Sequence, residues 1–68
     1  MSTDELTDYF GFLDDLRCYG ETNMFGAAPY LAAEFEELNA TEARAVLATW
    51  MRTYDNAKTP AERAELVV

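Results

Sequence analysis

The sequence contains no histidine, and among its 68 residues it has one cysteine and five basic side chains. Without histidine, the chain lacks the commonest general base and the commonest nitrogen ligand for metals. A single cysteine cannot form a disulfide within the chain, and it fits a reducing environment. Cys18 has Arg17 beside it and no histidine to activate it, so we expect an unreactive thiol. These absences predict a protein that is not an enzyme and that uses no metal or cofactor.

The sequence also lacks a long apolar run, an internal repeat and a basic N-terminal segment. No apolar run approaches the ~20 residues that a membrane-spanning helix needs. The first residues, MSTDELTD, are acidic where a signal peptide would be basic. We therefore expect a soluble, cytoplasmic protein, with residues 1–68 forming a single helical domain. A chain this short buries only about 60% of its unfolded surface, so good packing or a partner has to add to its stability.

Acidic side chains dominate: thirteen of them stand against five basic ones, for a net charge of −8. The excess lies in residues 1–42, which hold ten acidic residues and one arginine, whereas residues 43–68 are nearly balanced. Such a chain repels nucleic acid and anionic membranes at long range. It is attracted instead to basic surfaces of proteins, and otherwise the charge simply keeps the chain in solution.

Apolar residues recur every three or four positions in three segments, which is the spacing of amphipathic helices. The most regular stripe is Ala43, Val46, Leu47, Trp50, Met51 and Tyr54; the others are Leu6, Tyr9, Phe10, Leu13 and Leu16, and Met24, Ala28, Leu31, Phe35 and Leu38. The fold class predicted is all-α, a compact three-helix bundle with a short fourth C-terminal helix. The helices are expected over about 3–19, 27–36, 40–55 and 60–67.

Local signals place the ends of these helices. Three capping pairs mark helix starts, each a polar residue followed three positions later by glutamate: Ser2 with Glu5, Asn39 with Glu42, and Thr59 with Glu62. Gly20 is a natural stop for the first helix, and Pro29 belongs in the first turn of the second. Gly11, inside the first helix, suggests close packing or a bend. The last helix has few apolar residues, so it frays or docks through Leu66 and Val67.

Several large side chains lie beside the predicted core and are candidates for a surface that binds a partner. They are Phe12, Tyr19, Met24, Phe25 and Tyr30. A contiguous exposed aromatic patch marks a site for another macromolecule, whereas burial in the core is the alternative for each residue. Asp14 and Asp15 point away from the apolar stripe, and neighbouring carboxylates on a helix splay apart. We expect them on a solvated acidic face that joins the candidate partner-binding surface.

The second and third helices, joined by a short turn, resemble a helix-turn-helix unit. In proteins with that unit, the second of its helices enters the major groove of DNA. Here the outward face of that helix carries Thr41, Arg44, Ala48 and Arg52. The alternative function is thus a nucleic-acid-binding regulator that uses this face. Two arginines among many carboxylates would release few counterions, so nucleic acid is the less favoured partner.

Three segments resemble a family of small uncharacterised proteins of tailed phages and prophages. They are YFGFLDDLR at 9–17, TNMFGAAPYL at 22–31 and EARAVLATWM at 42–51. The resemblance implies a viral origin and a location in the cytoplasm of a bacterial host, and it implies no particular activity. Combined with the charge, it leads us to expect a small acidic interaction protein. It would bind a host or viral protein, competing for a basic surface, or associate with itself as a homodimer.

Overall fold

The computed structural model describes residues 2–20, 26–55 and 57–67, and within these ranges it contains four helices and no strand. The helices are α1 (Thr3–Tyr19), α2 (Ala28–Glu34), α3 (Ala40–Arg52) and α4 (Pro60–Glu65). The all-α prediction is confirmed. The first helix has the predicted bounds, while the other three end two or three residues earlier than expected.

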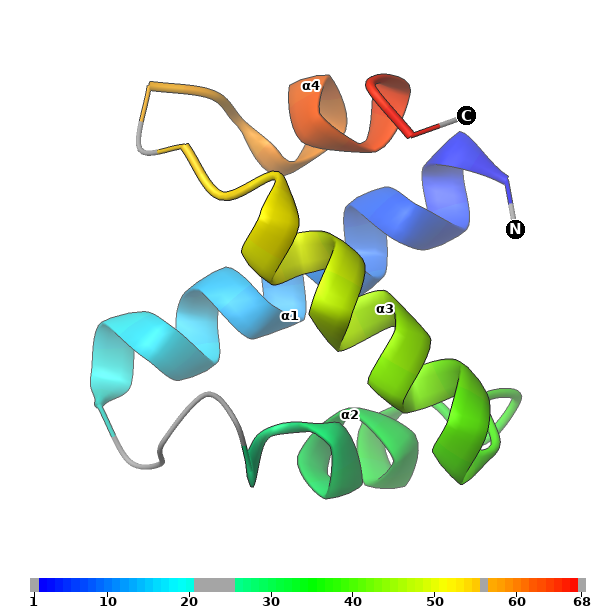
Figure 1. Cartoon of the computed structure of the whole chain (residues 1–68). Helices are drawn as coiled ribbons and strands as arrows, with labels where there is room; N and C mark the ends of the chain where they lie inside the picture. Colours follow the sequence, from blue (N-terminus) through cyan, green and yellow to red (C-terminus); the bar gives the residue numbers. More distant parts are fainter. Residues whose placement is uncertain (1, 21–25, 56, 68) are drawn as a thin grey trace.

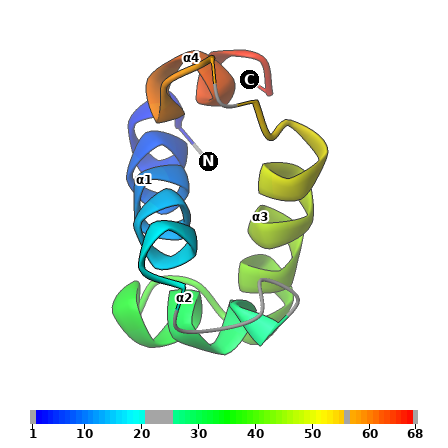
Figure 2. The same ribbon diagram turned by 90° about the vertical axis from the view of Figure 1, so that its left-hand side faces the viewer.

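The two longest helices lie on opposite sides of the molecule. In Figure 1, α3 crosses in front of α1, with α4 above and α2 below. The turned view in Figure 2 places α1 on the left and α3 on the right, and α2 and α4 close the bottom and the top. α4 packs mainly against α1, and α2 packs mainly against α3. The outer faces of α1 and α3 are therefore directed away from each other.

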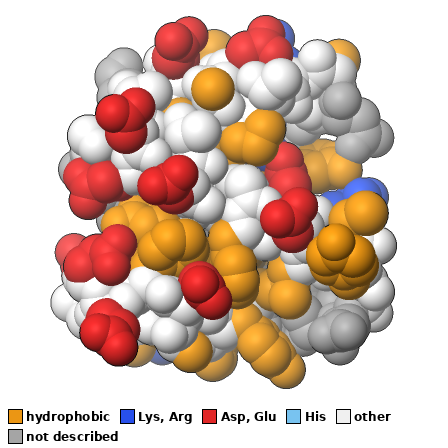
Figure 3. Space-filling view, turned by 180° about the vertical axis from the view of Figure 1, so that it is seen from behind, with side chains coloured by type: hydrophobic (Ala, Val, Ile, Leu, Met, Phe, Trp, Pro, Cys, Tyr) orange, Lys and Arg blue, Asp and Glu red, His pale blue; other side chains and the backbone are white. Residues whose placement is uncertain are grey.

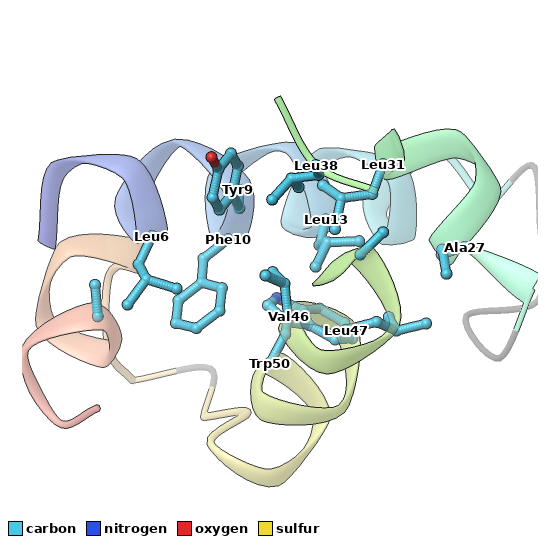
Figure 4. Close-up of a cluster of buried hydrophobic side chains, with 13 residues drawn as sticks. Leu6, Tyr9, Phe10, Leu13, Ala27, Leu31, Leu38, Val46, Leu47 and Trp50 are labelled. Atoms are coloured by element: carbon cyan, nitrogen blue, oxygen red, sulfur yellow. The ribbon is translucent and has the colours of Figure 1, made fainter. Parts of the chain in front are cut away.

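The predicted apolar stripes meet in one buried cluster, shown in Figure 4. Its members are Leu6, Tyr9, Phe10, Leu13, Ala27, Ala28, Leu31, Leu38, Ala43, Val46, Leu47, Trp50 and Ala64. Leu16, Phe35, Met51 and Tyr54 pack against the cluster and are partly buried. Every described residue of the three stripes thus belongs to the core or its border, and Met24 lies outside the described residues.

Side-chain caps begin three of the helices, as the capping pairs predict. In α3, the Glu42 N–H donates to Asn39 Oδ1 over 2.8 Å, and the Asn39 N–H donates back to Glu42 over 3.1 Å. The same reciprocal bonds join Ser2 with Glu5 and Thr59 with Glu62. Each capping pair satisfies two backbone N–H donors that a helix start would otherwise leave unpaired. In α1, the bond from the Ser2 N–H also lowers the pKa of Glu5 below its ordinary value.

α4 docks differently from the prediction. Leu66 and Val67 are exposed, so the expectation that the last helix docks through them is wrong. The residues of α4 that are buried are Arg63 and Ala64. A six-residue helix offers one or two inward positions, and here these fall on Arg63 and Ala64 one turn earlier than the apolar pair.

Gly11 occupies a position where alanine is expected to be better. A Cβ added there meets no other atom within 4 Å, so close packing does not explain the glycine. Because glycine inside a helix costs about 1 kcal/mol relative to alanine, Gly11→Ala should raise the free energy of unfolding by about 1 kcal/mol. Thermal unfolding followed by circular dichroism checks this. Gly20 is the opposite control: its φ of +67° makes Gly20→Ala destabilising by about 1 kcal/mol.

Candidate interaction surfaces

A buried arginine of α4 links three parts of the fold. Arg63 is 1% exposed, and its guanidinium donates three hydrogen bonds. Nη1 donates to Asp14 of α1 over 2.9 Å, Nη2 to the Trp50 carbonyl over 2.6 Å, and Nε to the Thr53 carbonyl over 3.1 Å. The guanidinium carbon also lies 5.2 Å from the ring centroids of Phe10, Trp50 and Tyr54, within the range of cation–π attraction.

These bonds also account for the early end of α3. In a continuing helix, the Trp50 carbonyl would accept from the N–H of Tyr54, four residues on. Here the Trp50 carbonyl accepts from Arg63, and the Tyr54 N–H donates to Met51 over 3.4 Å instead. A cation at a helix C-terminus also interacts favourably with the helix dipole. Arg63 therefore caps α3, and the helix stops at Arg52.

The prediction that Asp14 lies on a solvated face is wrong. Its side chain is 31% exposed, and its Oδ1 accepts from both Arg63 and the indole N–H of Trp50, the latter over 2.8 Å. Asp14 follows the buried Phe10 by four positions and so lies on the same side of α1, which turns it toward α3 and α4. Its neighbour Asp15 is exposed, as expected. Pairing Asp14 with Arg63 withdraws one acid and one base from the surface.

The remaining charges of the described residues are exposed and mostly acidic. The exposed acids are Asp4, Glu5, Asp8, Asp15, Glu34, Glu36, Glu37, Glu42, Asp55, Glu62 and Glu65, and the exposed bases are Arg17, Arg44, Arg52 and Lys58. Figure 3, which views the molecule from behind Figure 1, shows carboxylates spread over that side with hydrophobic side chains between them. The surface is therefore strongly negative, as the composition predicts.

One exposed strip runs along α1, and we name it the acidic face. It consists of Asp8, Phe12, Asp15 and Tyr19, which follow at steps of four, three and four and so share one side of the helix. Tyr19 is 77% exposed, whereas Phe12 is half-buried and meets the Phe35 ring edge-on at 5.8 Å. The sequence prediction included three of these residues and missed Asp8.

Of the other predicted candidates, only Tyr30 belongs to the described part of the chain. Tyr30 is exposed on α2, a different helix from α1. Met24 and Phe25 lie outside the described residues. The patch of five large side chains therefore stays a prediction, because two of its members lie outside the described residues.

A second exposed strip runs along α3, and we name it the α3 face. Thr41, Arg44, Ala48 and Arg52 are all exposed, as the alternative function requires. Beside it, a groove of about 350 Å³ lies between α2 and α3. The groove is lined by Gly26, Ala28, Pro29, Ala32, Ala40, Arg44 and Leu47, so it is mainly apolar and has one arginine at its wall.

A smaller cavity of about 230 Å³ borders the Arg63 bonds. Its lining includes Arg17, Cys18, Tyr54 and Lys58, and the Arg17 guanidinium carbon lies 4.7 Å from the centre of the Tyr54 ring. Cys18 is exposed. The described residues contain no cluster of three or more potential metal ligands. Among the helices the structure describes, none has the length and apolar character needed to cross a membrane.

A buried tyrosine ties α1 to the connection between α2 and α3. The Tyr9 hydroxyl donates to the Glu37 carboxylate over 2.9 Å, and the Tyr9 ring meets Phe35 edge-on at 4.7 Å. Burial raises the pKa of Tyr9 to about 12, and the bond to Glu37 adds to the shift. Glu37 is exposed, so its carboxylate both serves Tyr9 and contributes to the negative surface.

No protein-family model, no curated protein and no solved structure matches this chain.

Proposed function

We propose that this chain is a small acidic interaction protein without catalytic activity, which binds a basic surface of another protein through the acidic face of α1. The observation that supports this most directly is the charge of the described surface, on which exposed acids greatly outnumber exposed bases. Burial of Arg63 removes one of the five basic side chains from that surface. The negative potential would speed encounter with a basic partner and disfavour acidic ones.

The acidic face also offers apolar area, which charge alone does not provide. Tyr19 stands out from the end of α1, and the half-buried Phe12 lies between Asp8 and Asp15. Aromatic side chains supply much of the contact energy in interfaces, while charges at the rim set orientation and association rate. A basic protein surface with an apolar centre is therefore the partner that fits best.

The resemblance to small phage proteins supports a bacterial or viral partner inside the host cytoplasm. A basic surface that normally holds nucleic acid would suit the charge of this chain. The protein would then compete with nucleic acid for that surface.

Neutralising the acidic face is expected to weaken capture of such a partner. The tagged full chain is incubated with bacterial lysate, and captured proteins are compared between wild type and the Asp8→Asn/Asp15→Asn variant. Because both carboxylates are exposed, the variant should fold normally and retain several-fold less of any specific partner. The matched control, Asp55→Asn/Glu65→Gln, loses the same charge elsewhere and should capture as wild type does.

The affinity for a captured partner should fall at least tenfold between about 50 and 500 mM salt, since exposed charges are screened over these distances. Affinity that is independent of salt, or equal loss in the control variant, would contradict the proposal.

The helix-turn-helix alternative is separated by a titration with mixed-sequence duplex DNA at low salt. We expect no binding, because the negative surface repels the phosphates. Binding that disappears in Arg44→Ala/Arg52→Ala would favour the regulator instead.

A further inference from the structure

The acidic face of α1 has a complement on the opposite side of the same molecule. Asp8 and Asp15 are seven residues apart, about 10 Å along the helix, and Arg44 and Arg52 are eight apart, about 12 Å. All four side chains are exposed. We propose that the α3 face and its groove receive the acidic face of α1 from a second copy of this chain. The inference rests on the proposed function, because it names one basic surface for the same acidic face.

The two helices fit best in antiparallel orientation. Placing Asp15 beside Arg44 brings Asp8 to Arg52, and the half-buried Phe12 then lies opposite Ala48. A large side chain thus faces a small one at the centre, with an ion pair on each side. This is the pattern of an apolar contact flanked by complementary charges.

The same orientation gives the groove an occupant. Tyr19 lies four residues beyond Asp15, about 6 Å further along α1. In the antiparallel register this step leads from Arg44 toward Ala40, and both residues line the groove between α2 and α3. The most exposed aromatic ring on α1 therefore arrives at the apolar groove. In the parallel register, Tyr19 would pass Arg52 and leave the groove empty.

The position of the two faces determines the kind of assembly. Since α1 and α3 lie on opposite sides of the molecule (Figure 2), one pair of copies cannot exchange both contacts across a twofold axis. The contact is head-to-tail, and such contacts form rings or open chains. The net charge of −8 opposes association, so assembly is expected at high protein concentration.

Charge-reversed variants of the full chain test this by sedimentation velocity at rising protein concentration. The average molecular mass of the wild-type species should rise with protein concentration. Arg44→Glu/Arg52→Glu and Asp8→Lys/Asp15→Lys should each remain monomeric, because in each variant both facing surfaces carry the same sign. An equal mixture of the two should associate again, since each face then meets its opposite. Circular dichroism verifies that each variant keeps the helical content of wild type.

Truncating the aromatic ring separates this contact from nonspecific charge attraction. Tyr19→Ala should weaken self-association about tenfold. Leu66→Ala, a change at another exposed apolar residue, should leave it unchanged.

Monomeric wild type at all concentrations, or a mixture that does not associate, overturns the inference. So does self-association that survives both reversals. None of these results affects the proposed function, because Arg44→Glu/Arg52→Glu keeps the acidic face and should still capture a basic partner. Failure of the proposed function alone would appear as normal self-association without salt-sensitive capture.

Discussion

Arg63→Ala is expected to lower the free energy of unfolding by about 3 to 5 kcal/mol, the range seen when one partner of a buried ion pair is removed. The change removes the guanidinium donors of the Trp50 and Thr53 carbonyls, and it leaves the Asp14 carboxylate with the Trp50 indole N–H but without its positively charged partner. Because Asp14 is 31% exposed, water can solvate part of its carboxylate in the variant. The loss of stability should therefore lie near the lower end of the 3 to 5 kcal/mol range. A chain of this size has a total stability of roughly 3 to 10 kcal/mol. Urea unfolding at pH 7 should therefore find the variant largely unfolded or barely stable.

One further variant tests whether stability depends on the planar geometry of the Arg63 guanidinium, and a second serves as a surface control. Arg63→Lys keeps the charge, but one ammonium cannot reach three acceptors arranged for a planar guanidinium, so we expect an intermediate loss of about 2 kcal/mol. Arg52→Ala removes an exposed arginine and should change stability by less than about 0.5 kcal/mol. Equal effects of Arg63→Ala and Arg52→Ala would show that the buried bonds do not hold α4 in place.

The fold could be predicted because most of its signals are local. Apolar spacing identified each stripe, and three capping pairs fixed the starts of α1, α3 and α4. In α1 the stop at Gly20 was equally clear, since its left-handed conformation favours glycine. These signals require no knowledge of how the helices pack.

The Arg63 bonds could not be predicted in this way, because they join residues far apart in the sequence. Arg63 is 49 positions from Asp14, and Trp50 is 36 positions from it. A pattern of polar and apolar residues assigns both charged residues to the surface, where most such residues lie. One signal was available: a helix over 60–65 with few apolar residues needs some other inward contact. The same bonds explain why α3 ends before the apolar pattern does.

The α3 face could be predicted from the sequence, whereas the groove and part of the acidic face could not, because they depend on how the helices pack. The α3 face follows directly from the amphipathic pattern, because it is the opposite side of the buried stripe. The groove beside it depends on how α2 packs on α3, which the sequence does not specify. On α1, the sequence identified Tyr19 as a candidate exposed aromatic. The role proposed for Asp8 depends on two similar spacings, the one between Asp8 and Asp15 and the one between Arg44 and Arg52.

Alkaline pH is expected to destabilise the protein through Tyr9. The pKa of this residue is raised from 10.0 to about 12, first because its ring and hydroxyl are buried and then because Glu37 accepts its hydrogen bond. The negative charges of Glu37, Glu5 and Glu42 shift it in the same direction. The unfolded chain therefore releases the phenolic proton before the folded chain does. Stability contributed by the neutral hydroxyl is complete below pH 10 and declines from pH 10 to 12, by about 2 kcal/mol.

Tyr9→Phe should reverse the order of stability between neutral and alkaline solution. At pH 7 the variant loses the hydrogen bond to Glu37 and is expected to be about 1 kcal/mol less stable than wild type, with the ring contact to Phe35 retained. At pH 12 it should be more stable than wild type by about 1 kcal/mol, because no buried phenol remains to ionise. Urea unfolding at pH 7, 10, 11 and 12 measures the crossing. Tyr30→Phe, at an exposed tyrosine, should follow wild type throughout, and parallel curves for Tyr9→Phe and wild type would show that Tyr9 titrates at an ordinary pKa.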